Sequence, residues 1–151
     1  MNFFADVILP LPLQGTFTYK LTPNQRKSLG IGHRVAVSFG KRKIYTGVIK
    51  HIHNQKPDFS EIKPIEFSYD SDALISQSQI KFWSWMSKYY FTPLGDVLKA
   101  AIPSTFLLES DTVIVKKEIE ENNLDDLTED EFLIYEALGF KNLKINEVSE
   151  I

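Results

Sequence analysis

Histidine and aspartate residues form the first candidate chemical groups in this sequence. His51 and His53 alternate within one predicted strand, so their imidazoles share a face, as two zinc ligands would. A zinc site needs three or four ligands, and no third ligand lies nearby in the sequence. We therefore predict a surface histidine pair and no metal site. Asp70 and Asp72 precede a predicted helix and are interpreted as turn or capping residues rather than as an acid–base or metal pair.

The common catalytic motifs are absent from the sequence. It contains no G-x-x-x-x-G-K-[ST] phosphate loop, no G-x-G-x-x-G loop and no H-E-x-x-H pair, and no Ser, His and Asp spacing that indicates a nucleophile. The absence of cysteine excludes disulfides and thiolate zinc sites within these residues. We predict that this segment is not an enzyme and holds no cofactor.

Charge is distributed unevenly along the 151 residues. Residues 1–105 carry 13 Lys and Arg against 7 Asp and Glu, a net charge of +6, whereas residues 106–151 carry 4 against 13, a net charge of −9. This asymmetry favours a polyanion-binding first part and a separate second part. No apolar run reaches the roughly 20 residues that span a bilayer. Asp6 and the adjacent prolines argue against a signal peptide, so we expect a cytoplasmic protein without a membrane partner.

The first part of the chain has the pattern of short β-strands. Alternating apolar residues and turn signals predict strands at residues 2–9, 16–21, 33–40, 43–53 and 61–68. In the third of these, Val35, Val37 and Phe39 share the buried face, and a basic turn joins it to the fourth as a hairpin. Pro64 predicts an edge strand or a bulge. Together the strands predict a small antiparallel β-barrel.

A pair of helices is predicted to follow the strands, which makes the fold class α+β. The first helix lies between Ser76 and Phe91 and is capped by Asp72 or Ser76. Its spacing predicts one broad apolar face, made of Phe82, Trp83, Met86, Tyr89 and Tyr90. Pro93 is typical of the first residue of a second helix, which ends before Pro103.

The pattern changes again from Asp111. Residues 111–119 predict a strand and residues 120–130 an acidic linker. Thr128 and Glu131 form a capping box for a helix that ends near Gly139, and residues 144–151 predict the start of another helix. Because two such short helices bury little apolar surface, we expect this chain to be a piece of a longer protein.

A small barrel with basic loops and aromatic residues suits single-stranded nucleic acid. Lys and Arg side chains bind phosphates there, while aromatic faces stack on bases. The candidate basic residues are Lys41, Arg42, Lys43, Lys50 and Lys63. The alternative is a protein-interaction barrel whose aromatic surface docks a partner chain. Salt distinguishes the two, because only phosphate-driven binding weakens steadily as salt rises.

Several ordered segments resemble one family. KYYFTPLGDVLKAAIPSTF, residues 88–106, resembles the end of the N-terminal domain in the primosomal protein N′ (PriA) family of bacterial replication-restart DNA helicases. ADVILPLPLQGTFTYKL resembles the opening strand, proline turn and Thr-Phe-x-Tyr strand of that family, and GIGHRVAVSFGKRKIYTGVI resembles its Phe-Gly hairpin. EIKPI lies where the family has Leu-Lys before an apolar strand. The resemblance covers about residues 3–106.

The resemblance implies a domain organisation. Residues 1–106 would form a DNA 3′-end-binding, OB-like β-barrel with its C-terminal helical pair. Residues 107–127 would form a strand and an acidic linker, and residues 128–151 the truncated start of a winged-helix domain. In the family, ATP-driven 3′→5′ unwinding, with its ATP, Mg and zinc, belongs to later domains. The partners implied are forked DNA with free 3′ ends, other primosome proteins and single-stranded-DNA-binding protein.

The resemblance also implies a pocket for the 3′-terminal nucleotide of the nascent leading strand at a stalled fork. Matched by motif, its residues are Phe17, Thr18, Gly40 and Lys63, with Lys41, Arg42 and Lys43 as weaker backbone contacts. Phe17 would stack on the base, Gly40 would allow close approach, and Lys63 would donate to base or phosphate. Thr18 departs from the family pattern, which has aspartate there, and a hydroxyl is a weaker acceptor than a carboxylate.

Overall fold

The computed structural model describes residues 2–41, 43–58, 61–111, 113–117 and 127–148. The chain divides into two compact units, Met1–Ser110 and Asp111–Ile151. Among the residues that the structure describes, no helix is long and apolar enough to cross a membrane.

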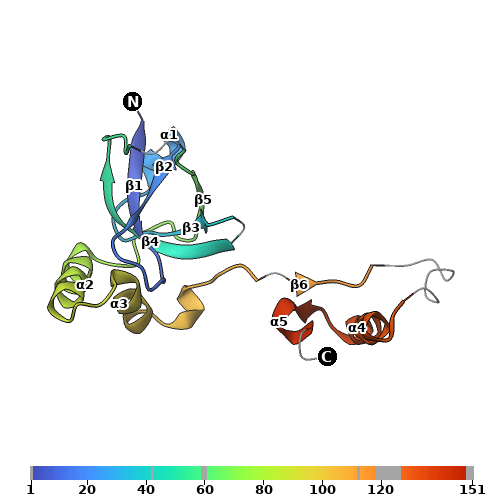
Figure 1. Ribbon diagram of the computed structural model, residues 1–151. Helices are drawn as coiled ribbons and strands as arrows, with labels where there is room; N and C mark the ends of the chain where they lie inside the picture. Colours follow the sequence, from blue (N-terminus) through green and yellow to red (C-terminus); the bar gives the residue numbers. More distant parts are fainter. Residues whose placement is uncertain (1, 42, 59–60, 112, 118–126, 149–151) are drawn as a thin grey trace. The chain divides into compact units, whose positions relative to one another are not determined.

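The first unit is built on a five-stranded antiparallel sheet in the order β2-β1-β4-β3-β5, which curls into a half-barrel (Figure 1). The strands are β1 Phe3–Ile8, β2 Phe17–Leu21, β3 Arg34–Phe39, β4 Lys43–His53 and β5 Ile65–Ser68. The predicted OB-like α+β fold is thereby confirmed. The last strand is shorter than predicted, because residues 61–63 lie outside it and Pro64 forms only an isolated bridge.

The two edge strands of the curled sheet approach each other and close one side of the half-barrel. The Lys20 N–H on β2 donates to the Lys63 carbonyl at 2.9 Å, and Lys20 forms a parallel bridge with Pro64. Gln25, on helix α1 (Pro23–Ser28), donates to the Ile65 carbonyl at 3.0 Å. Because proline has no N–H to continue a ladder, the contact stays a local seam between residue 20 and residues 63–65.

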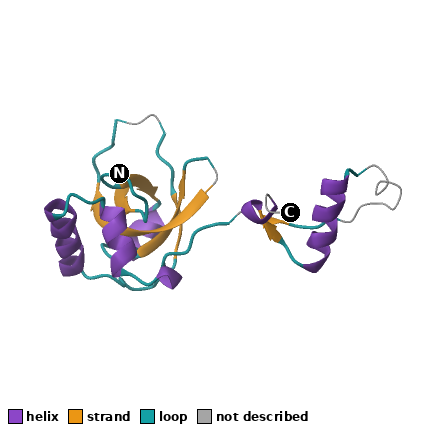
Figure 2. Ribbon diagram, turned by 60° about the horizontal axis from the view of Figure 1, so that its bottom comes forward, coloured by secondary structure: helices purple, strands orange, loops and turns teal. Residues whose placement is uncertain are grey.

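Apolar side chains are buried on both faces of the sheet. The interior face holds one core, formed by residues that include Ala5, Val7, Tyr19, Val35, Val37 and Ile49, with Phe39 half-buried beside it. On the outer face Ile8 and Val48 pack against helices α2 (Gln77–Tyr89) and α3 (Leu94–Ala101), which Figure 2 shows on one side of the sheet. This double burial explains why β1 is apolar at most positions instead of strictly alternating.

The predicted apolar face of α2 is wrong in part. Ser76 caps the helix through a capping box with Gln79, as predicted, and Ile80 and Trp83 are buried. Three of the five predicted face residues are exposed instead: Phe82, Tyr89 and Tyr90. The helix lies on the outside of the sheet. It contacts the sheet through a narrow stripe of side chains at three-residue spacing, which includes Ile80 and Trp83. Trp85 lies exposed between Phe82 and Tyr89, with ring centroids 5.8 Å and 5.1 Å apart.

An ion pair connects β3 to the segment before α2. Arg34 donates from Nε to Asp70 Oδ2 at 2.8 Å and from Nη2 to Oδ1 at 2.6 Å. The third guanidinium nitrogen, Nη1, donates to the carbonyl of Phe106 at 3.1 Å. Phe106 is the last residue of the 3₁₀ turn Ser104–Phe106. The hydrogen bond from Arg34 lowers the pKa of Asp70. Asp70 is therefore a structural anchor.

The second unit pairs β6 (Val113–Ile114) with β7 (Leu143–Lys144) and contains α4 (Glu129–Phe140) and α5 (Ile145–Val148). The capping box of Thr128 and Glu131 is confirmed. The predicted strand over 111–119 is wrong at residues 115–117, which form no strand. Residues 118–126, with most of the acidic linker, lie outside the described residues. The division into a 3′-end-binding domain, a linker and a winged-helix start stays a prediction.

Gly95 lies at a close contact between helix α3 and the chain segment that follows β1. A Cβ at this position of α3 would meet the carbonyl oxygens of Leu9 and Leu11, which are rigid backbone atoms. Helix propensity alone predicts that Gly95→Ala stabilises by about 1 kcal/mol. We expect destabilisation by about 1–3 kcal/mol instead, because overpacking forces the backbone to move.

Urea unfolding followed by tryptophan fluorescence measures this effect, since both tryptophans, Trp83 and Trp85, lie on α2. Ala100→Gly is the matched control, because it changes propensity at an exposed position of the same helix. A Gly95→Ala variant more stable than the wild type would contradict the close contact.

Candidate nucleic-acid interface

One pocket of about 380 Å³ lies beside the seam of the half-barrel. Phe17 and Thr18 line it from β2, Gly40 from the turn after β3, and Lys63 from the segment before β5. The structure thus brings all four predicted pocket residues together from three separate segments. The seam explains this, because the bond from Lys20 to the Lys63 carbonyl holds residue 63 against β2.

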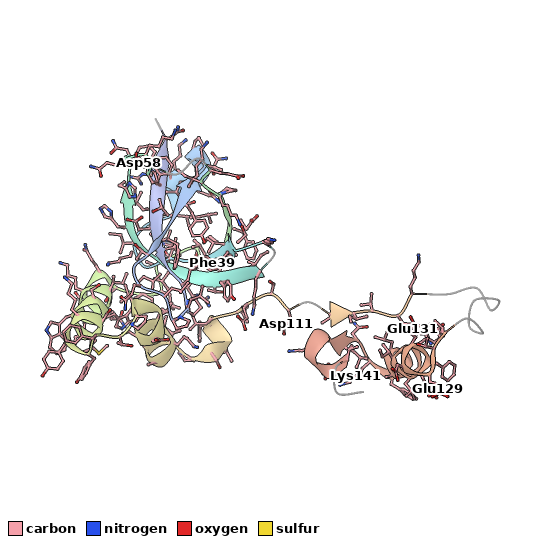
Figure 3. All side chains as sticks on the ribbon, in the orientation of Figure 1. Phe39, Asp58, Asp111, Glu129, Glu131 and Lys141 are labelled. Carbon is pink, nitrogen blue, oxygen red and sulfur yellow. The ribbon has the colours of Figure 1, made fainter. Side chains whose placement is uncertain are left out.

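Aromatic side chains form the apolar wall of the pocket. Phe17 is half-buried and packs edge-on against Phe39, with ring centroids 4.8 Å apart and planes at 73° (Phe39 is labelled in Figure 3). Tyr19, the next residue on that face of β2, donates to the Ser38 carbonyl at 3.1 Å. Burial raises the pKa of Tyr19 to about 12, so its hydroxyl stays a neutral donor. The wall is therefore fixed by core packing.

Backbone geometry and a lysine define the opposite side of the pocket. Gly40 has φ +67, the left-handed region that favours glycine, and a Cβ there would meet nothing within 4 Å. Its carbonyl accepts a hydrogen bond from Lys63 Nζ at 2.5 Å. An ammonium has three donors, so Lys63 can contact Gly40 and still donate to a ligand.

Thr18 is held by an acidic residue that the sequence analysis did not select. Its hydroxyl donates to Asp6 Oδ1 at 2.7 Å, and the two residues are cross-strand partners in β1 and β2. A hydroxyl has one proton and two lone pairs, so this bond leaves Thr18 to act as an acceptor. The register of the two strands was the signal that could have found Asp6. Glu61, also not selected, lines the same pocket.

The basic turn after β3 is described in part, and its role as a weaker contact to the DNA backbone stays a prediction. Lys41 is exposed. Arg42 lies outside the described residues. Lys43 forms an ion pair with Glu109 at 3.2 Å, and its ammonium lies 5.2 Å from the centroid of the Tyr45 ring. The hydrogen bond to Glu109 raises the pKa of Lys43. Of the two described lysines, only Lys41 is free of an ion pair.

A larger basic groove lies next to the pocket. It has a volume of about 780 Å³ and includes Lys20, Arg26 and Lys27 in its lining. Ile62 lines both cavities, so the groove adjoins the pocket. The Arg26 guanidinium lies 5.0 Å from the centroid of the Phe3 ring. Sequence analysis missed these cations because they come from the end of β2 and from α1, where no motif indicated binding.

An OB-like half-barrel with an aromatic pocket and an adjoining basic groove has the features that single-stranded nucleic-acid-binding modules use. The comparisons with known proteins agree with this class and narrow it. Residues 6–103 match the family model described as the 3′DNA-binding domain (3′BD) of PriA. The chain therefore belongs to the PriA 3′-DNA-binding-domain family.

Three relatives, all called "Replication restart protein PriA", show the extent of the similarity. The protein of Treponema pallidum (strain Nichols) is 29% identical over 67% of this chain and 16% of its own length. The protein of Buchnera aphidicola subsp. Acyrthosiphon pisum is 31% identical over 76% of this chain and 15% of its own length. The protein of Chlamydia pneumoniae is 30% identical over 68% of this chain and 13% of its own length. The chain thus spans about a sixth or less of these relatives.

Proposed function

We propose that this chain binds the 3′ end of DNA in replication restart, with the pocket beside the seam as the binding site. The observation that carries the proposal is the convergence of Phe17, Thr18, Gly40 and Lys63 in one pocket. Family membership and the names of the relatives support DNA as the ligand. Phe17 stacks on the terminal base, and Lys63 donates to the base or to its phosphate.

Thr18 accepts a hydrogen bond from the 3′-hydroxyl in this proposal. Because the Thr18 proton is committed to Asp6, its lone pairs are available to a ligand. A hydrogen bond to a charged acceptor also polarises the donor oxygen, which strengthens it as an acceptor. Asp6 is therefore a positioning residue, and it offsets the loss of the carboxylate that the family carries at the position of Thr18.

The strand that leads into the pocket lies in the basic groove. Lys20, Arg26 and Lys27 would contact phosphates on the 5′ side of the terminal nucleotide, and the groove adjoins the pocket at Ile62. Phosphate contacts supply affinity and position without selecting the end. The lysines of the turn after β3, chiefly Lys41, would add a weaker contact.

In its wider context, the chain would present the 3′ end of a nascent leading strand at a stalled fork to a helicase core in other domains. It would itself be a non-enzymatic part of an ATP-dependent helicase, acting in the cytoplasm with other primosome proteins and single-stranded-DNA-binding protein. The acidic second unit would be the start of a winged-helix domain. ATP, Mg and zinc would belong to those other domains.

The exposed aromatic row Phe82–Trp85–Tyr89 on α2 favours a second candidate function, a protein-interaction surface. Exposed aromatic residues at this density mark docking sites for protein partners. An interaction of this kind would keep its strength at raised salt, whereas phosphate-driven DNA binding would weaken.

End recognition can be tested with short single-stranded oligonucleotides that carry a free 3′-hydroxyl, carry a 3′-phosphate, or are closed into a circle. We expect the wild type to prefer the free hydroxyl. Phe17→Ala and Lys63→Ala should each lower affinity for that oligonucleotide about tenfold, because stacking on a base contributes roughly 1–3 kcal/mol. Fluorescence anisotropy measures the dissociation constants.

Lys81→Ala is the control for lost charge, since Lys81 is an exposed lysine on α2 outside the pocket. It should leave the preference unchanged. Equal binding of the open and closed oligonucleotides by the wild type would overturn end recognition. If the wild type binds neither the open nor the closed oligonucleotides, even at low salt, the protein-interaction function is favoured.

The acceptor role of Thr18 can be tested with oligonucleotides that end in a 2′,3′-dideoxynucleotide, which lack only the 3′-hydroxyl. Thr18→Val removes the hydroxyl with little change of shape. It should abolish a preference of about fivefold for the hydroxyl-ended oligonucleotide, since one hydrogen bond contributes about 1 kcal/mol. Thr18→Ser should retain it. A Thr18→Val variant with undiminished preference would show that another group accepts the bond.

The groove residues should behave differently from the pocket residues. Arg26→Ala and Lys27→Ala are expected to weaken binding of all linear oligonucleotides equally, whatever their 3′ terminus. Each should lower the slope of log affinity against log salt by about 1, because one phosphate contact is lost. Anisotropy titrations across a salt series measure the slope. A change in preference for the 3′ terminus, with an unchanged slope, would contradict this assignment.

A further inference from the structure

Three potential metal ligands meet on the outer face of the sheet. Asp6 on β1 is paired in register with His51 on β4, and the register then shifts, so that Ile49 pairs with Val7. His51 and His53 lie two residues apart on one face of β4, with their rings stacked at a centroid distance of 5.6 Å. One ligand atom from each of the three side chains lies within 4.8 Å of the other two.

The third ligand was invisible in the sequence because it comes from a different strand. Asp6 Oδ1 lies 3.3 Å from His53 Nε2, and Asp6 Oδ2 lies 3.7 Å from His51 Nδ1. The two histidines alone are too few for a zinc site, which needs three or four ligands. Strand pairing between β1 and β4 supplies that ligand 45 residues away in sequence. The reason for expecting no metal therefore no longer holds.

We propose that Asp6, His51 and His53 bind a divalent transition-metal ion of the zinc type. Two imidazoles and a carboxylate are a ligand set that Zn²⁺ uses, with water or another group in the fourth position. Ligand atoms in a tetrahedral zinc site lie about 3.4 Å apart, given metal–ligand bonds of roughly 2.0–2.1 Å. Two of the present separations, 3.3 Å and 3.7 Å, are close to that value, and all three ligand atoms lie within 4.8 Å of one another.

The surroundings of the cluster suit an open site of modest affinity. The side chain of His51 is 61% exposed, whereas those of Asp6 and His53 are 25% and 18% exposed, so an ion can enter from one side. Thr18 donates to Asp6 and would orient this ligand from outside the metal sphere. His53 Nδ1 is buried without a hydrogen-bond partner among the described residues. Because such a partner normally strengthens a histidine ligand, binding should be weaker than in a closed four-ligand site.

Asp6 would link the metal site to the pocket. Asp6 contacts both His53 and Thr18, and Thr18 lines the pocket. A bound cation would offset the negative charge of Asp6 beside the DNA and so favour a phosphate nearby. This consequence rests on the proposed DNA-binding function, whereas metal binding itself does not.

Isothermal titration calorimetry of the tag-free chain with ZnCl₂ tests the site directly. We expect one Zn²⁺ per chain, and visible absorption of Co²⁺ in the same site should show the intense bands of tetrahedral coordination. His51→Gln removes an exposed ligand without disturbing the core and should lower zinc affinity at least tenfold. Asp6→Asn should do the same while its amide oxygen still accepts from Thr18. Glu66→Gln, at an exposed carboxylate on β5, is the matched control and should bind zinc as the wild type does.

Two results would overturn the proposal: a wild-type chain that binds no zinc, or a His51→Gln variant that binds it as tightly as the wild type. In either case Asp6 and the histidines are only a hydrogen-bonded surface cluster. Anisotropy with and without Zn²⁺ then addresses the pocket separately. Zinc binding without any change in DNA affinity would remove the link through Asp6, and zinc binding in a chain that fails to bind DNA would leave the metal site intact.

Discussion

The seam between Lys20 and residues 63–65 is the constraint on which the pocket and the groove depend. Residues 61–64 belong to no strand, so the sheet hydrogen-bond ladder does not position Lys63. The backbone bond from Lys20 and the Gln25 contact to Ile65 do so instead. Residues of the seam line both cavities, Lys63 the pocket and Lys20 and Pro64 the basic groove. Loss of the seam would therefore move Lys63 away from Gly40 and Thr18 even if the five strands stayed paired.

Asp6 connects the pocket with the histidine pair of β4, because it contacts residues of both. It lies between the pocket residue Thr18 and the histidines of β4, and its two carboxylate oxygens are divided among them. Neighbouring residues of β1 are fully buried, which fixes the strand and hence the direction of the Asp6 side chain. A half-exposed acid on a rigid strand is held in place at little cost in side-chain entropy.

The five strands and the helical pair of the first unit were predicted well because local patterns determine them, and the four residues matched by motif line one pocket. Turn residues, capping boxes and alternation define where elements begin and end, and the Phe-Gly hairpin marks the end of β3. Contacts between distant segments of the barrel were harder to predict from the sequence. The apolar stripe of α2 was misjudged because helical spacing shows which residues share a face, but does not show how wide a sheet surface the helix meets. Asp6 was missed because its partners come from other strands, and the groove cations because they lie at the end of β2 and on α1, where no motif indicated binding.

The distribution of charge explains how one small barrel can separate affinity from selectivity. The pocket combines one cation, Lys63, with Glu61 in its lining and Asp6 behind Thr18, so its net charge is low. The contacts proposed for it are stacking and hydrogen bonds, which depend on shape and change little with salt. The adjoining groove holds three cations and no acid among its lining residues in the part of the chain that the structure describes. In the proposed function, phosphates would therefore bind in the groove through long-range attraction, which salt weakens, while short-range geometry would select the terminal nucleotide. A pocket as basic as the groove would attract any phosphate, and would hold a 3′-phosphate at least as well as a free hydroxyl.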